Sequence, residues 1–275
     1  MRVMYDGSNY NGWQLQPHQP SVQGLVETVL SRKLQQSIRI VGASRTDTGV
    51  HARGQMVHFD CVKADMTQEE TAKFVHQLNL ILPSDVRVSD LELAPEIRYV
   101  EHVQATKAWH AIFCARGKLY SYRIFLGDTL DPLDRIARYR EFKPVNVSLL
   151  YEAAACFQGT HDFAAFTNNP RDKVRAEELQ TTAGATVRSI RKVEVVDEGA
   201  GKYRLDFYLD GALYRMVRNI VGAILAVSYG RLLLQDIQAL LDGSITRRQL
   251  RKVWNAAPAH GLCLERVYYE DLASD

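Results

Sequence analysis

The order in which hydrophobic patterns follow one another most restricts how this chain can fold. Apolar residues at every second position are typical of strands, and apolar residues three or four positions apart are typical of helices. We predict strands over residues 1–7, 39–42, 54–60, 85–93, 117–127, 186–196, 202–211 and 262–270. We predict helices over residues 21–34, 66–82, 147–159 and 212–230, with two more helical stretches before the last strand. Because these elements do not form a regular βαβ series, they favour an α+β fold over a doubly wound one.

Local signals mark several of the predicted helices. Ser21 is a typical N-cap residue at the start of an apolar pattern, and Thr67 and Glu70 have the spacing of a capping box. The longest helix carries a single apolar stripe, which predicts one buried face. The stripe consists of Leu213, Met216, Val217, Ile220, Val221, Ile224 and Leu225.

The elements fall into two halves with a similar mixture of strands and helices. A chain of 275 residues suits one large domain or two modest ones. We predict a boundary near residues 104–107, which gives an N-terminal α+β domain, 1–104, and a C-terminal α+β domain, 105–275.

Composition excludes several functional classes. Hydrophobic residues make up 46% of the chain and charged residues 24%, which is ordinary for a folded soluble protein. No apolar run approaches the roughly 20 residues that span a bilayer, and no secretory signal is visible. The four cysteines are far apart, which argues against a zinc site or a disulfide framework and favours a reducing compartment.

The balance of charge limits how the chain could bind nucleic acid. Its net charge is only +2, so any such contact must come from basic residues that are gathered locally. Two segments gather them, residues 135–140 ("RIARYR") and residues 247–252 ("RRQLRK"). The alternative, which charge alone favours, is that both segments are solvated faces of helices or loops.

The segment "GASRTDTGVHARGQ", residues 42–55, is the strongest candidate for chemistry. Asp47 opens an Asp-Thr-Gly turn sequence in which Gly49 can supply a positive φ, so a purely structural Asx turn is one interpretation. The other interpretation depends on Arg45, because a cation two residues away would favour the ionised carboxylate. An ionised and positioned carboxylate is a usable nucleophile or base.

Histidines in and beside this segment raise the question of a metal site. His51 and His58, with Asp47 and Asp60, could be read as ligands. Their spacing matches no dedicated motif, and a metal site needs three or four converging ligands, so we predict none. His58 alternates with its neighbours and is better interpreted as a strand residue.

Two residues in the second half also suit a binding site. Arg218 lies about 120° from the centre of its helix's apolar stripe, a position that can face a cleft. The alternative is a surface arginine whose stem covers apolar neighbours. Tyr120 suits a stacking platform for a base, although a core tyrosine is the default interpretation.

Six segments, taken together, carry a family resemblance. In chain order they are "YDGSNYNGWQ" (5–14), "SRTDTGVHARGQMVHF" (44–59), "KLYSYRI" (118–124), "GTHDFAAFT" (159–167), "LYRMVRNIVGAIL" (213–225) and "APAHGLCLERVYY" (257–269). The series closely resembles the TruA-type tRNA pseudouridine synthases over nearly the whole chain. The R-T-D-x-G-V-H-A core and the M-V-R-N-I-V-G helix are specific, and the other segments are supportive.

The resemblance implies a reaction and an architecture. Such enzymes turn uridine into pseudouridine in the anticodon stem-loop of tRNA, at positions 38, 39 and 40, without a metal, nucleotide or redox cofactor. The implied fold is two related α+β domains, each a mostly antiparallel sheet packed with helices, around a basic cleft. The implied partners are tRNA and a second copy of the chain in a homodimer, with no membrane. The implied setting is the cytoplasm in a bacterium, or an organelle or the nucleus in a eukaryote.

The resemblance also implies roles for four residues. Asp47 matches the catalytic aspartate, which either attacks the sugar or first takes a sugar proton. Arg45 matches an arginine that helps to extrude the target nucleotide. Tyr120 matches a tyrosine that packs on the target uracil, and Arg218 matches an arginine that pairs with the aspartate.

The chain departs from the family pattern at two places, and two other functions are alternatives to the synthase. Ile112 stands where the family often has an arginine, and the first strand starts late, so we expect a short edge strand. A tRNA-binding homologue that has lost turnover is the alternative, although the four intact site residues argue against it. A metal-dependent nuclease is a distant third interpretation, which activity in a chelator would remove.

Overall fold

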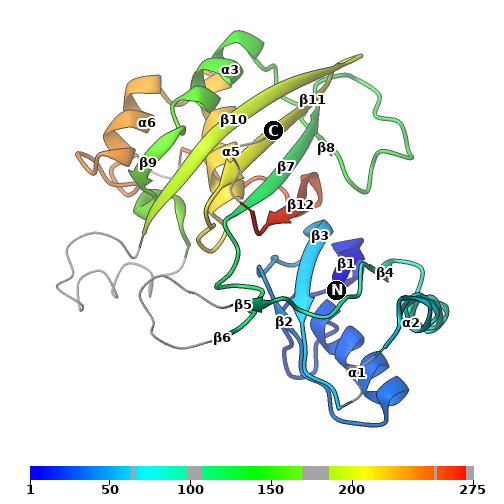
Figure 1. Cartoon of the computed structure of the whole chain (residues 1–275). Helices are drawn as coiled ribbons and strands as arrows, with labels where there is room; N and C mark the ends of the chain where they lie inside the picture. Colours follow the sequence, from blue (N-terminus) through cyan, green and yellow to red (C-terminus); the bar gives the residue numbers. More distant parts are fainter. Residues whose placement is uncertain (63–65, 98–106, 169–185, 251–252, 271–275) are drawn as a thin grey trace. The chain divides into compact units, whose positions relative to one another are not determined.

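The computed structural model describes residues 1–62, 66–97, 107–168, 186–250 and 253–270. The chain divides into two units (Figure 1). The N-terminal unit comprises Met1–Arg116 together with Leu264–Asp275, and the second unit comprises Gly117–Cys263. The boundary that the sequence predicts between residues 104 and 105 falls within 98–106, outside the described residues.

The sheet of the N-terminal unit has the strand order β4-β1-β3-β12, with β2 also paired to β3. Its strands are β1 (Arg2–Tyr5), β2 (Val41–Gly42), β3 (His51–His58), β4 (Val86–Ser89) and β12 (Leu262–Tyr268), which enters this unit at Leu264. A separate pair is formed by β5 (Glu96–Ile97) and β6 (Lys107–Ala108). Because β1 pairs antiparallel with both β3 and β4, the expectation of an edge position for this short strand is wrong.

Two helices belong to this unit, and both begin where the sequence predicts. They are α1 (Val22–Leu34) and α2 (Gln68–Ile81). The side chain of Ser21 accepts a hydrogen bond from the N–H of Gly24, and Thr67 and Glu70 form the predicted capping box. These side chains satisfy N–H groups that have no partner inside the helix, which fixes each start.

The sheet of the second unit has the order β7-β11-β10-β9. Its strands are β7 (Gly117–Phe125), β8 (Tyr139–Arg140), β9 (Gly159–Asp162), β10 (Val187–Gly199) and β11 (Lys202–Leu209). Neighbours along this order run antiparallel, and β8 pairs parallel with β7. The mixture of helices with mostly antiparallel strands confirms the predicted α+β class.

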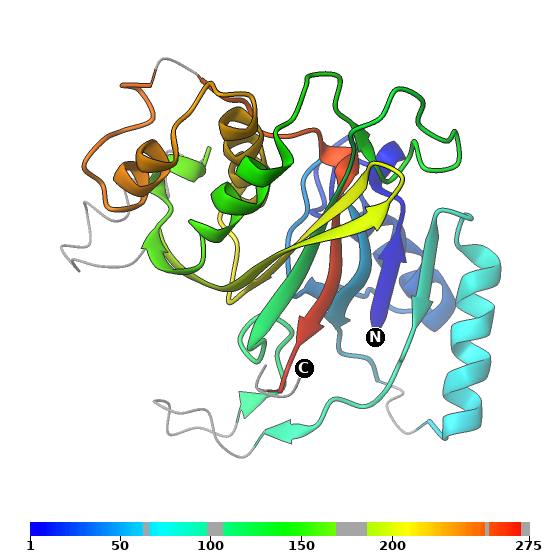
Figure 2. The ribbon, with the colours of Figure 1, turned by 90° about the horizontal axis from the view of Figure 1, so that it is seen from above.

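The helices of the second unit gather on one face of its sheet (Figure 2). They are α3 (Val147–Ala155), α5 (Met216–Ser228) and α6 (Leu234–Leu241). The apolar stripe predicted for residues 212–230 is buried, but α5 begins only at Met216. The reason is Arg215, whose φ of 59° lies in the left-handed region that a right-handed helix cannot continue through.

The end of α3 also differs from its prediction. The apolar pattern extends to Gly159, but the helix stops at Ala155. Gly159 has a φ of +113° and is the first residue of β9, so the chain has already changed direction there. No helix among the described residues is long and apolar enough to cross a membrane.

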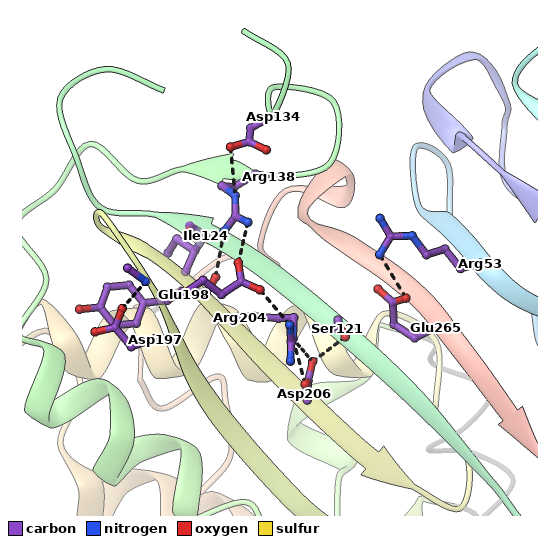
Figure 3. Close-up of polar contacts among 12 residues, drawn as sticks. Arg53, Ser121, Ile124, Asp134, Arg138, Asp197, Glu198, Arg204, Asp206 and Glu265 are labelled. Atoms are coloured by element: carbon purple, nitrogen blue, oxygen red, sulfur yellow. Dashed lines mark hydrogen bonds and ion pairs between the residues drawn. The ribbon is translucent and has the colours of Figure 1, made fainter. Parts of the chain in front are cut away.

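A network of ion pairs crosses the strands of the second unit (Figure 3). The buried Arg138 donates through Nη2 to Glu198 over 2.7 Å, and Glu198 also accepts from Arg204 over 2.8 Å. Arg204 donates to Asp206 over 3.0 Å, and Asp206 accepts from Ser121 over 2.5 Å. Arg138, which the sequence offered for nucleic-acid contact, is therefore a buried structural residue.

Candidate active site

The loop between β2 and β3, which carries Asp47, is held by backbone hydrogen bonds to residues 10–13. The N–H of Trp13 donates to the carbonyl of Thr46 over 3.1 Å, and the N–H of Gly49 donates to the carbonyl of Tyr10 over 3.4 Å. These bonds attach the loop at points on either side of Asp47. Its backbone is therefore supported by a segment more than 30 residues earlier in the chain.

Gly12 brings that supporting segment into direct contact with the loop. A Cβ atom on Gly12 would lie 2.5 Å from the carbonyl oxygen of Thr46 and 3.0 Å from the carbonyl carbon of Asp47. Gly12 also has a φ of +86°, which other residues adopt at a cost. Glycine is therefore required here by both space and conformation.

The Asp-Thr-Gly sequence forms the turn that its composition predicts. The N–H of Val50 donates to the carbonyl of Asp47 over 3.1 Å, and Gly49 has a φ of +77°. This bond uses the main chain of Asp47, not its carboxylate. The turn interpretation and the catalytic interpretation of this segment are thus compatible.

Two side chains fix the residues that lead into the turn. The hydroxyl groups of Tyr5 and Thr46 lie 2.8 Å apart in a buried hydrogen bond. The fully buried Gln55 donates to the carbonyl of Ser44 over 2.5 Å and accepts from its N–H over 3.2 Å. The loop is therefore held from β1 and from β3.

The side chains of this loop differ in burial. Thr46 is buried, Arg45 on one side of it is exposed, and Asp47 on the other side is half-buried. A carboxylate on a supported backbone that still reaches solvent has the preorganisation that a nucleophile or base needs. An exposed guanidinium two residues away can reach a bound polyanion.

The two histidines have partners in the main chain. Nδ1 of His51, the first residue of β3, accepts from the N–H of Gly7 over 3.1 Å. Nδ1 of His58, the last residue of β3, accepts from the N–H of Ala111 over 3.2 Å. Burial and the neighbouring His110 lower the pKa of His58. In the part of the chain that the structure describes, no three His, Cys, Asp or Glu side chains could together hold a metal ion.

Tyr120 lies in the middle of β7 in the second unit. Its side chain is 4% exposed, and it stands opposite Phe207 of β11. Tyr122, two residues on and therefore on the same face, donates its hydroxyl to the carbonyl of Pro258 over 3.0 Å. Both tyrosines are buried, as are Phe207 and Leu205 opposite them on β11, so they lie on the covered face of the sheet.

Arg218 lies in the first turn of α5 and is held at two points by one residue. Its carbonyl accepts from the N–H of Ala257, and its Nε donates to the carbonyl of Ala257, each over 2.8 Å. Burial raises the pKa of Tyr122 well above its ordinary value, and the charge of Arg218 opposes that rise. Arg218 therefore acts on the same face of β7 that presents Tyr120.

The four predicted site residues thus form two pairs. Arg45 and Asp47 share one loop of the N-terminal unit. Tyr120 and Arg218 belong to the second unit, where Tyr122 shares a face of β7 with Tyr120 and the charge of Arg218 opposes the rise that burial causes in the pKa of Tyr122.

The basic segment at residues 247–252 has a partly structural role. Arg247 is half-buried, with its guanidinium 4.7 Å from the ring centre of Trp254. It donates to Asn219 over 3.0 Å, and burial lowers its pKa. Arg248 is exposed, whereas residues 251 and 252 lie outside the described part of the chain.

The comparison with protein families decides the identity. The family model for tRNA pseudouridine synthases matches residues 1–99 and 153–270 of the chain. The chain belongs to the tRNA pseudouridine synthase family. Its members are isomerases that act in tRNA processing. The match to the family model confirms the resemblance that the six sequence segments indicated.

Individual relatives match along almost the whole chain. The chain is 36% identical to tRNA pseudouridine synthase A of Moorella thermoacetica, with 97% of both chains covered. It is 35% identical to tRNA pseudouridine synthase A of Citrifermentans bemidjiense, covering 98% of this chain and 96% of the relative. For tRNA pseudouridine synthase A 1 of Protochlamydia amoebophila the identity is 32%, with the same coverage.

The sequence alone did not assign a role to several residues that support the candidate site, most of which hold the Asp47 loop between β2 and β3. They are Tyr5, Tyr10, Gly12, Trp13 and Gln55 in the N-terminal unit, with Ala257 beside Arg218 in the second. The run "YNGWQ" offered a signal, because a glycine between an asparagine and a tryptophan suits a close backbone approach.

Proposed function

We propose that this chain isomerises uridine to pseudouridine in the anticodon stem-loop of tRNA, at positions 38, 39 and 40, with Asp47 as the catalytic carboxylate. Family membership supports the reaction class. The observation that carries the assignment to Asp47 is the support of its loop, in which Gly12 lies directly against the backbone of Thr46 and Asp47. A loop that only closed a turn would not need a second segment packed so closely against it.

The reaction is an isomerisation, so no second substrate is consumed and no group is transferred to or from another molecule. The bond from C1′ to N1 breaks, the uracil turns, and a bond from C1′ to C5 forms. The hydrogen on C5 leaves as a proton and N1 takes up a proton, so the electrons balance without an oxidant or a reductant. Asp47 either attacks C1′ or first removes a ribose proton, and both routes require its ionised form.

Arg45 has the properties of a residue that extrudes the target nucleotide. A base inside a stacked stem must leave the stack before its glycosidic bond can be reached, which costs a few kcal/mol. The guanidinium of Arg45 is exposed and lies two residues from Asp47 on the supported loop. It can therefore take the place of the extruded nucleotide while the carboxylate faces the sugar.

The second unit supplies the other two roles in this proposal. In this proposal Tyr120 packs against the target uracil, and Arg218 pairs with Asp47, as the family resemblance implies. The hydrogen bond from Nε to the carbonyl of Ala257 supports the role of Arg218, because it restricts the direction of the side chain. The position of Tyr120 on the same face of β7 supports its role beside Arg218.

We also propose a homodimer. A net charge of +2 is small for one subunit that must hold a whole tRNA, because affinity for nucleic acid grows with the number of phosphates neutralised. Sedimentation at micromolar protein should give the mass of two chains. A fully active monomer would contradict this part of the proposal.

Sequence-resolved mapping of pseudouridine tests the proposed function. A transcribed tRNA is incubated with the wild-type protein and, separately, with Asp47→Asn. The wild type should place pseudouridine at positions 38, 39 or 40, and the variant should place none. A wild type that binds the tRNA but forms no pseudouridine would instead identify the silent binding homologue.

A further inference from the structure

Two basic residues lie together at one end of the helix-covered face of the second sheet. Lys118 of β7 stands opposite Leu209 of β11, and Leu209 stands opposite Ile190 of β10. These three residues form one row on one face. Arg188 lies two residues before Ile190 on β10, which places it in the next row of the same face.

Two charged groups, Arg188 and Asp210, act on Lys118. Burial, and after it the charge of Arg188, lower the pKa of Lys118 to about 8, whereas Asp210 raises it. Among the described residues, the ammonium group of Lys118 makes no hydrogen bond or ion pair. Its partly buried ammonium group is therefore available to a ligand.

Asp210 is the carboxylate that acts on Lys118, and its side chain is also held by the main chain. It accepts from the N–H of Ser189 over 3.1 Å and from the N–H of Gly211 over 2.6 Å. Both bonds hold the connection that follows β11. A bound anion would interact favourably with both cations.

The position of Lys118 relates this pair to the active site. Lys118, Tyr120 and Tyr122 alternate along β7 and share one face, at about 7 Å per pair of residues. At the Tyr122 end of this row, the charge of Arg218 opposes the rise that burial causes in the pKa of Tyr122. A base that packs on Tyr120 would therefore have Lys118 beside it, at a neighbouring group of the RNA and not at the reacting sugar.

We propose that Lys118 and Arg188 together bind a phosphodiester group of the RNA next to the target nucleotide. This inference rests on the proposed function and deepens it. The two residues position the substrate and do not touch the reacting atoms. A phosphodiester fits because it offers two charged oxygens, one for each cation.

The charge of Lys118 gives this site a distinctive pH dependence. The charged groups that act on it are Arg188 from β10 and Asp210 from the connection after β11. Lys118 is protonated below about pH 8 and loses its charge above it. Affinity for RNA should therefore fall as the pH rises from 7 to 9. An arginine at position 118 would stay charged over this range.

Steady-state kinetics and binding on the full-length protein with a transcribed tRNA test the proposal. Lys118→Met should raise Kd and KM about tenfold with kcat within about twofold, and should reduce the slope of log Kd against log salt by about one. Lys118→Arg should keep the affinity and abolish its loss at high pH. Arg188→Met should weaken binding and move the remaining pH dependence upward, because the cation that lowers the pKa of Lys118 is gone.

Lys192→Met is the matched control. Lys192 is an exposed lysine of the same unit, paired with Glu194 and on the opposite face of the sheet. Its removal should leave KM and the pH profile unchanged.

Three results would overturn the proposal. They are a wild-type Kd and salt slope in Lys118→Met, a persistent loss of affinity at high pH in Lys118→Arg, or a lower kcat at unchanged KM. A wild type that forms no pseudouridine contradicts the proposed function instead, while the binding measurements still test this phosphate site.

Discussion

A Cβ atom on Gly12 would lie 2.5 Å from the carbonyl oxygen of Thr46, one residue before Asp47. Gly12→Ala must therefore push the loop away from its support. Since a shift of about 1 Å at a reacting group can cost about 100-fold in rate, we predict that kcat falls by about that factor. Affinity for tRNA should change by less than about threefold, because the cations that face the RNA remain. Single-turnover pseudouridine formation beside filter binding measures both quantities.

Gly230→Ala is the control for the strain of a left-handed residue. Gly230 has a φ of +69°, and an added Cβ there would meet nothing within 4 Å. Alanine in this conformation costs about 1–2 kcal/mol of stability at either position. Both variants should lose thermal stability, but only Gly12→Ala should lose rate. Equal rates in the two variants would show that the close contact with Thr46 does not support catalysis.

The buried ion pair between Arg138 and Glu198 predicts a pH-dependent stability. Burial alone would raise the pKa of Glu198, but the hydrogen bond and charge of Arg138, with the charge of Arg204, hold it below its ordinary value. A carboxyl group with a lowered pKa stabilises the fold above its unfolded pKa, about 4.3, and this contribution is lost as the pH falls further.

Arg138→Met should therefore reduce the free energy of unfolding by about 2 kcal/mol at pH 7 and by less near pH 3. Urea unfolding at the two pH values measures the difference. Arg135→Met, which removes an exposed arginine three positions away, should change stability by less than about 0.5 kcal/mol. A loss for Arg138→Met that is the same at both pH values would contradict the role of Glu198.

Much of the fold could be predicted from local signals. The starts of α1 and α2 followed from Ser21 and from the Thr67–Glu70 capping box, because a cap acts over three or four residues of sequence. The start of α5 could not be predicted in this way. Its apolar pattern continues through the residues before Met216, and only the backbone of Arg215 breaks the helix.

The residues of the candidate site could likewise be predicted only in part. Arg45 and Asp47 are neighbours in sequence, so their loop could be recognised directly. Gly12 could not be assigned, because its role depends on a contact with Thr46 that joins two distant segments. A glycine in a sequence does not reveal which backbone it approaches.

Ile112 stands where the resemblance suggests an arginine, and we predict that Ile112→Arg leaves turnover within about threefold of wild type. The side chain of Ile112 is 46% exposed in the N-terminal unit, so a charged replacement stays in solvent and should change stability by less than about 0.5 kcal/mol. Steady-state kinetics measure the outcome. A large gain in rate would show that Ile112 marks a weakened enzyme.

Arg45→Ala should slow the reaction while leaving the chemistry intact. The variant lacks the exposed guanidinium that, in the proposed function, offsets the cost of unstacking, a few kcal/mol, so the rate on a folded stem-loop should fall by about 100-fold or more. An RNA whose target uridine is already unpaired and unstacked should react at a rate closer to wild type. The ratio of the two single-turnover rates measures this. An equal loss on both substrates would mean that Arg45 does not act in extrusion.

Single-turnover pseudouridine formation by Asp47→Asn, beside its filter-binding affinity for tRNA, tests the central assignment most directly. Asparagine keeps the size of the side chain but cannot act as the nucleophile or base. We predict that Asp47→Asn binds tRNA within about tenfold of wild type, that is, within about 1.4 kcal/mol, and forms no detectable pseudouridine. Appreciable turnover by this variant would contradict the account and leave Asp47 as a turn residue.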